Sequence, residues 1–107
     1  MKRYHKNIAE KWFKMSLAEQ IANIGSEYFR AKSWKLKGNN AFFEPAFDRM
    51  LELMHLSLSD KRWSLSQLKE IARLKEVVGR YLFEEVSFQE DKDFDDYFMQ
   101  FSILARK

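Results

Sequence analysis

The feature that most constrains this chain is a helical rhythm of apolar residues running through most of its 107 positions. Apolar side chains recur every three or four residues, a spacing that places them on one face of an α-helix. Residue types that begin or end helices separate these stretches, and proline occurs once and glycine three times. The pattern predicts an all-α protein, an antiparallel four-helix bundle preceded by a short N-terminal amphipathic helix or arm.

Capping signals predict where the helices begin and end. Ser16-Leu17-Ala18-Glu19 and Ser64-Leu65-Ser66-Gln67 have the form of capping boxes, in which a Ser hydroxyl and a Glu or Gln side chain satisfy the first free amides. Gly38 after two lysines predicts a left-handed helix end. We expect one domain over residues 1–107, with an arm over 1–14 and helices over 16–37, 41–58, 65–84 and 94–106.

Two boundaries are less regular. Pro45 would remove a backbone hydrogen bond if Asn40 opened the second helix, so we expect either a kink at the proline or a start close to Glu44. The acidic stretch 84–93 has no apolar period, which predicts a loop and a last helix capped by Asp93.

The spacing also predicts which faces are buried. On the first helix, the residues expected to face the core are Leu17, Ile21, Ile24, Tyr28 and Ala31. A second row of mostly small residues, a small-residue seam, would let a neighbouring helix approach closely; it consists of Ala18, Ala22, Gly25 and Phe29. The third helix buries Leu68, Ile71, Val78 and Leu82, flanked by Leu65, Ala72 and Leu74. The last helix seals the bundle with Phe94, Tyr97, Phe98, Phe101 and Leu104, leaving Phe88 and Met99 outside.

Charge is divided along the chain. Residues 1–83 hold sixteen basic and nine acidic residues, a net charge of +7, whereas residues 84–107 hold three and seven, a net charge of −4. Two interpretations stay open: the acidic last helix lies against basic neighbours, or the basic surface stays open to nucleic acid.

Composition excludes several classes of site. The chain has no cysteine, which removes disulfides, zinc thiolates and a thiol nucleophile and fits a reducing compartment. His5 and His55 are fifty residues apart, and a single Glu-x-x-His unit ends at His55, so we predict no metal site and no cofactor. No apolar run is long enough to cross a membrane, and the charged segment Met1 to Lys14 is not a secretory signal. We therefore expect a cytoplasmic protein without membrane contact.

One pair of residues suggests catalysis. Arg49 precedes His55 by six positions, a spacing that resembles the Arg-x(4 to 6)-His motif of the HEPN ribonucleases, in which the pair acts on the RNA 2′-hydroxyl and phosphate. Met50 departs from the polar residue usual after that arginine. The alternative is that Arg49 is solvated and that His55 is favoured by the helix C-terminus.

Binding residues are predicted in two regions. The arm carries Tyr4, Ile8 and Trp12 at helical spacing, either as a lid on the chain's own core or as a docking element for a protein partner. Basic residues interleaved with tryptophan would suit nucleic acid, since cations contact phosphates while an indole stacks on a base; these are Arg30, Lys32, Trp34, Lys35, Lys37, Lys61, Arg62 and Trp63. The alternative is that they are ordinary helix-end cations and rim tryptophans.

From Trp12 to the C-terminus the chain resembles a family of small uncharacterised bacterial proteins. The segment that carries most of this resemblance is Met15-Ser16-Leu17-Ala18-Glu19-Gln20 followed by Asn23-Ile24-Gly25-Ser26-Glu27. Pro45 and His55 depart from the pattern of this family. The family has no assigned activity, so the resemblance implies no catalytic residues for this chain. In size and helix number the chain is more distantly similar to the non-enzymatic bundles that accompany reverse transcriptases in diversity-generating retroelements. The sequence favours a non-enzymatic bundle that self-associates or docks on a larger protein or ribonucleoprotein, with a HEPN-like ribonuclease as the alternative.

Overall fold

A computed structural model describes the backbone of residues 6–83 and 88–106 and the side chains of residues 9–83 and 92–106. Over this part the chain forms helices and no strand, in the order α1 (Lys6–Trp12), α2 (Leu17–Leu36), α3 (Asn40–Leu58), α4 (Leu65–Phe83) and α5 (Phe88–Ala105). The prediction of an all-α helical bundle is confirmed.

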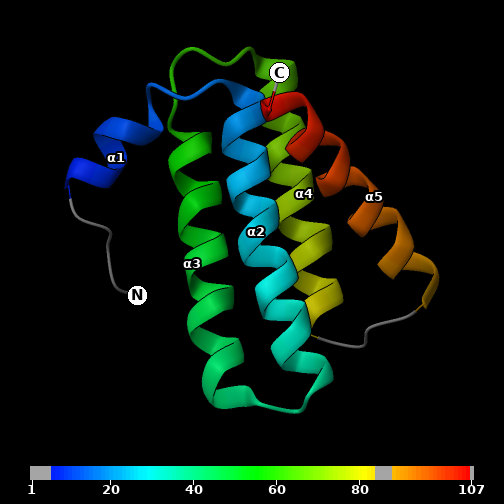
Figure 1. Cartoon of the computed structure of the whole chain (residues 1–107). Helices are drawn as coiled ribbons and strands as arrows, with labels where there is room; N and C mark the ends of the chain where they lie inside the picture. The colour runs from blue at the N-terminus through cyan, green and yellow to red at the C-terminus, as the bar shows by residue number, and fades with distance from the viewer. Residues whose placement is uncertain (1–5, 84–87, 107) are drawn as a thin grey trace.

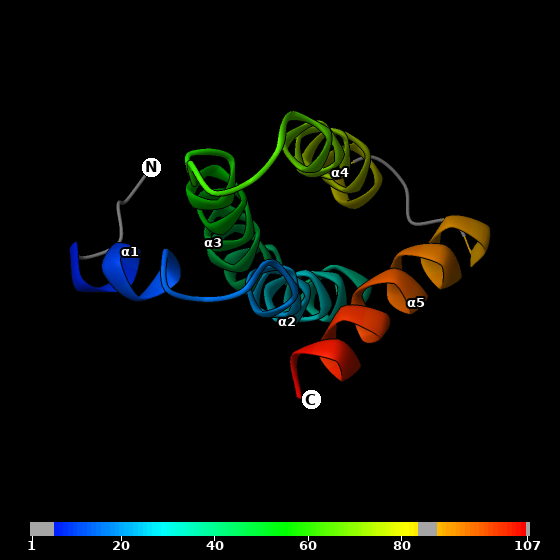
Figure 2. The same cartoon turned by 90° about the horizontal axis from the view of Figure 1, so that it is seen from above.

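The four long helices alternate in direction (Figure 1). Helix α2 packs most extensively against α3 and α5, while α4 packs mainly against α3. Seen from above, α2 lies between α3 and α5, and α4 lies on the opposite side of the bundle from α2 (Figure 2). The short helix α1 lies beside α3, away from α4 and α5.

Local sequence explains the helix ends. The Ser16 hydroxyl accepts from the Glu19 amide at 3.1 Å, and Glu19 Oε1 accepts from the Ser16 amide at 3.0 Å. The Ser64 and Gln67 pair makes the same reciprocal bonds at 3.2 and 2.8 Å. Gly38 follows α2 with a φ of 70°, a conformation that costs glycine little. Both capping boxes and the left-handed stop are confirmed.

The small-residue seam of α2 brings α5 close. The backbone of Gly25 faces Phe98, so that a Cβ added at Gly25 would lie 2.9 Å from the Phe98 Cβ. Phe98 is buried, and its ring lies 4.7 Å from that of Tyr28 in the core. The absence of a side chain at Gly25 therefore sets the distance between α2 and α5 at this level.

Of the two alternatives for Pro45, a start of α3 near Glu44 is wrong, because the helix begins at Asn40 with Pro45 inside it, within one residue of the predicted range 41–58. Asn39 is the cap, and its side chain accepts from the Phe42 amide at 3.2 Å. Phe43 and Phe47, on either side of the proline, are buried with their rings 5.5 Å apart. Their burial offsets the loss of the hydrogen bond that a proline cannot donate.

Over residues 88–93 the predicted loop is wrong, and so is the cap at Asp93, because α5 already begins at Phe88. Good helix formers, Gln89, Glu90 and Lys92, extend the helix where no apolar period signals it. Residues 84–87 and the side chain of Phe88 lie outside the described part of the chain.

Three apolar residues assigned to buried or flanking positions are exposed instead. Leu65 is 69% and Leu104 is 45% exposed, and Ala72 also faces solvent. Leu65 begins α4 and Leu104 lies in the last turn of α5, where fewer neighbouring residues cover a side chain. Met99 is exposed as predicted.

Candidate functional site

A buried polar network joins α1, α2 and the α3–α4 connection. Gln20, which is fully buried, donates to the Trp12 carbonyl at 2.8 Å and to Asp60 Oδ2 at 3.0 Å. Its Oε1 accepts from the Ser57 hydroxyl at 2.8 Å and from the Trp63 indole at 3.1 Å. These contacts use both donors and both acceptor positions of the amide. A fully satisfied network of this kind fixes the packing and leaves Gln20 no capacity for a ligand.

Asp60 completes the network as a fixed anion. Its carboxylate accepts two bonds from the Arg62 side chain, at 3.0 and 2.7 Å, and one from the Arg62 amide at 3.0 Å. The side-chain bonds from Arg62 are the main cause that lowers the pKa of Asp60 to about 2. Arg62 in turn donates to the Met15 carbonyl at 2.7 Å. A carboxylate so weakly basic is a poor proton acceptor near neutral pH, so this cluster is structural.

Trp12 belongs to the chain's own core. It is 2% exposed, and its indole donates to the Ser57 hydroxyl at 3.1 Å. Burial among apolar neighbours satisfies both its ring and its N–H, which favours the lid alternative for this residue. Binding of a partner through Trp12 stays a prediction. Tyr4 and the side chain of Ile8 lie outside the described part of the chain.

Two of the basic residues predicted to contact nucleic acid are buried or half-buried and engaged inside the bundle. Lys32 Nζ lies 2.7 Å from Asp95 Oδ2, and the Tyr28 hydroxyl donates to Asp95 Oδ1 at 2.8 Å. Lys35 donates to the Leu82 carbonyl, and burial lowers the pKa of its ammonium group. Lys32 and Asp95 show the acidic last helix pairing with a basic neighbour, the first of the two interpretations of the charge division.

The other predicted nucleic-acid residues do not form one surface. Arg30 pairs with Glu27 at 2.7 Å, and Lys37 Nζ lies 5.0 Å above the Trp34 ring. Trp63 is held by Gln20 and covered by the Arg62 guanidinium, 4.4 Å from its ring centre, while Lys61 is exposed. The first group lies at the C-terminal end of α2 and the second in the α3–α4 connection, at opposite ends of the bundle (Figure 1). Nucleic-acid binding by these residues stays a prediction.

Arg49 and His55 are exposed on α3 and do not come together within one chain. Six residues make one and two-thirds helical turns, so the two side chains leave the helix in directions about 120° apart. Arg49 Nη1 lies 4.0 Å from Glu27 Oε1, on the side toward α2. The pair resembling the HEPN motif therefore requires a second protomer, and its catalytic role stays a prediction.

The described residues contain no group of three or more histidine or acidic side chains placed to hold a metal ion. Across the same residues, no helix has the length and apolar character needed to cross a membrane.

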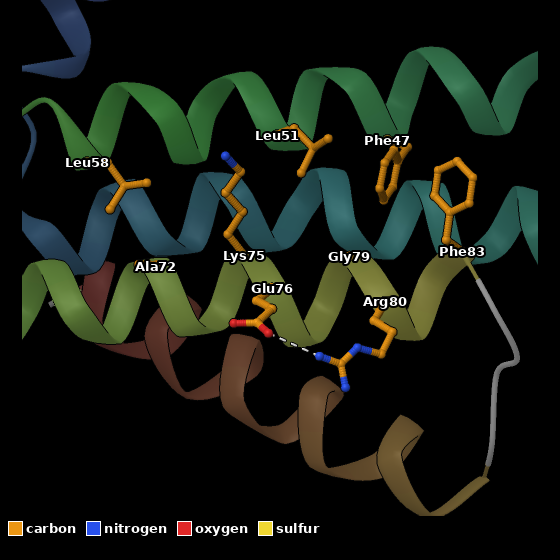
Figure 3. A pocket seen from close by; sticks show the side chains of 9 residues that line it. All are labelled: Phe47, Leu51, Leu58, Ala72, Lys75, Glu76, Gly79, Arg80 and Phe83. Carbon is orange, nitrogen blue, oxygen red and sulfur yellow. Dashed lines mark hydrogen bonds and ion pairs between the residues drawn. The ribbon is translucent and has the colours of Figure 1, made fainter.

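An apolar groove of about 570 Å³ lies between α3 and α4 and is here called the α3/α4 groove (Figure 3). Helix α3 contributes Phe47, Leu51 and Leu58, and helix α4 contributes Ala72, Lys75, Glu76, Gly79, Arg80 and Phe83. In Figure 3 the three α3 side chains point toward α4, and Phe83 points back toward α3. The groove combines a continuous apolar surface with three charged residues on its α4 side, Lys75, Glu76 and Arg80.

Small residues on α4 leave this groove open. Ala72 and Gly79 are seven positions apart and so lie on the same helix face. A Cβ added at Gly79 would meet only the tip of the Phe47 ring, at 4.0 Å. At the end of the groove, Phe83 is 65% exposed although its ring lies 5.0 Å from that of Phe47. The prediction of Ala72 beside the buried face of α4 did not indicate this groove. The seven-residue spacing of Leu65, Ala72 and Gly79 is the sequence signal that does.

Comparison with known proteins finds no matching family model, no matching curated protein and no matching solved structure. The resemblance to a bacterial family therefore stays a prediction, and function is argued from the chain itself.

Proposed function

We propose that this chain is a non-enzymatic helical bundle of the cytoplasm that acts by binding protein, through self-association or by docking on a larger assembly. The observation that carries the proposal is the α3/α4 groove, in which Phe83 is 65% exposed beside an apolar floor. Exposed apolar surface of this kind is typical of a protein interaction site. A groove between two helices suits the apolar face of another helix.

The polar groups of the described chain support a role without chemistry. Two of its buried or half-buried ionic pairs, Asp60 with Arg62 and Lys32 with Asp95, join side chains within the bundle. Among the described residues, the polar ones that line the α3/α4 groove are Lys75, Glu76 and Arg80, so no Ser, Thr or Cys nucleophile and no histidine base lines it. Glu76 and Arg80 pair with each other at 3.1 Å.

Position-specific photo-crosslinking in the native cell tests this proposal. A photoreactive amino acid at exposed Ala72 samples the groove, and the same residue at Lys92, exposed on α5, is the matched control. We expect protein adducts from position 72 and none of the same adducts from position 92. Identical adducts from both positions, or none from position 72, would contradict a binding groove. RNA cleavage by the purified chain that is lost in Arg49→Ala and His55→Ala would replace the proposal with the ribonuclease alternative.

A further inference from the structure

The α3 side of the groove is acidic. Glu44 and Asp48 are exposed, and they precede the groove residues Phe47 and Leu51 by three positions each. Residues three apart are neighbours on a helix, so both carboxylates border the groove on its solvent side. Arg49 leaves the helix toward Glu27, away from this border.

The α4 side of the groove is basic. Lys69 is exposed three positions before the groove residue Ala72, and Arg73 is exposed seven positions before Arg80, which lines the groove itself. Glu76 is the acidic residue on this face, and Arg80 pairs with it. Three cations against one anion leave the α4 border positive, opposite the negative border of α3.

We propose that the occupant of the α3/α4 groove is the same groove of a second copy of this chain, related by a two-fold axis that runs parallel to the helices. This inference rests on the proposed function and names its partner. A rotation about such an axis lays α3 of each copy antiparallel on α4 of the other. The acidic border of each chain then faces the basic border of its partner, twice over in an isologous interface.

The alternative two-fold axis, in the interface but perpendicular to the helices, is disfavoured by charge. It would lay α3 antiparallel on α3 and α4 antiparallel on α4, so that the acidic helix border would lie on its own copy and the basic border would do the same. Like charges placed against each other across an interface oppose association. The charge pattern therefore selects one geometry of the dimer.

Aromatic packing sets the height of the contacts. The Phe47 and Phe83 rings lie 5.0 Å apart, which puts these residues at one level of the groove. Asp48 follows Phe47, and Arg80 lies one turn before Phe83, so both are close to that level. Rotation about an axis parallel to the helices preserves height, and Asp48 of one copy therefore meets Arg80 of the other.

The same arrangement covers apolar surface that the single chain leaves open. Leu65, Ala72 and Gly79 are spaced by seven residues, the repeat with which antiparallel helices pack side by side. Leu65 and Phe83 are 69% and 65% exposed near the two ends of this face. The small residues between them give room for the large side chains of a partner helix.

Charge reversal tested by sedimentation equilibrium distinguishes this dimer from any other association. We expect the full-length chain to be dimeric, and Asp48→Arg or Arg80→Asp alone to weaken the dimer at least about tenfold, because each places like charges at both contacts. An equimolar mixture of these two variants should form heterodimers, since both contacts then join opposite charges. Asp96→Arg and Arg106→Asp, reversals at exposed positions of α5, are the matched controls and should leave the dimer unchanged.

Circular dichroism of each variant checks that the fold is intact, as expected for exposed side chains. A wild-type chain that stays monomeric at high concentration overturns the inference. So does a mixture of the two reversed chains that stays monomeric. If the purified chain is monomeric while position 72 crosslinks to a different protein, the inference fails and the proposed function stands; if position 72 gives no adduct at all, the proposed function fails as well.

Discussion

Two glycines in the middle of two helices provide a matched test of how the bundle packs. Gly25 of α2 faces α5, where an added Cβ would lie 2.9 Å from both Cβ and Cδ1 of Phe98. Gly79 of α4 faces the groove, where an added Cβ would meet the Phe47 ring at 4.0 Å. Alanine at position 25 would therefore clash with Phe98, whereas alanine at position 79 would lie at an ordinary van der Waals distance from Phe47.

The expected energies have opposite signs. Replacing glycine by alanine inside a helix stabilises the fold by roughly 0.5–1 kcal/mol at either position. At Gly25 the extra methyl group forces α2 and α5 apart, and overpacking of this kind costs about 1–3 kcal/mol. Gly79→Ala should therefore raise the free energy of unfolding by about 0.5–1 kcal/mol, while Gly25→Ala should lower it by up to about 2 kcal/mol.

Urea unfolding followed by circular dichroism measures both values. The protein is kept dilute, because association would add a concentration-dependent stabilisation. In thermal unfolding, each kcal/mol corresponds to a shift of about 4–8 °C for a domain of this size. A Gly25→Ala variant that gains as much stability as Gly79→Ala would refute the close packing of Phe98 on α2.

Two further predictions concern charged groups inside the bundle. Lys32→Ala and Asp95→Ala should each lower the free energy of unfolding by about 1–3 kcal/mol. This loss is smaller than for a fully buried pair because Asp95 is partly exposed. Strictly additive losses in the double variant would show that the two side chains do not interact. The hydrogen bonds from Arg62 hold the pKa of Asp60 at about 2, below its ordinary value of 3.8. The ionised Asp60 side chain therefore stabilises the fold fully at pH values above 3.8, and this contribution is lost as the pH falls through 2. The free energy of unfolding, measured across this pH range, should therefore depend less steeply on pH in Asp60→Asn than in the wild type. Equal slopes would contradict the lowered pKa of Asp60.

Local signals in the sequence predicted local structure well. The caps at Ser16 and Ser64 depend on residues three positions apart, and the structure forms the expected bonds at both. The small seam around Gly25 correctly indicated a close neighbour, although the sequence did not show that Phe98 would be the residue in contact. Short-range chemistry of this kind is contained in a few adjacent residues.

Contacts between distant segments were not predictable in the same way. Gln20 meets Ser57, Asp60 and Trp63, which are 37 to 43 positions away, and no local pattern specifies which polar groups will meet. The one local signal is that Gln20 lies beside the apolar residues Ile21 and Ile24, where a buried polar group requires partners. The start of α5 was missed for a different reason, since its first turn is held by helix propensity and carries no apolar period.

The open groove and the secured ends of α4 have a common explanation. Near its start, the network of Gln20, Asp60 and Trp63 ties the preceding connection to α2. Near its end, Lys35 binds the Leu82 carbonyl. Helix α4 is thus held at both ends.

The groove lies between these two attachments of α4. It stays open because the residues that face it are small, and not because the helix is weakly anchored. Ala72 and Gly79 carry too little side chain to fill the space between α4 and α3, so Leu51 stays half-buried and the groove stays open. Larger residues at both positions would add dispersion contacts within the chain. A helix held at both ends, with small residues facing the groove between them, presents a preformed surface, and a preformed surface loses little conformational freedom when a partner binds. This rigidity is the physical reason to expect that a second copy docks at the groove without rearrangement of either bundle.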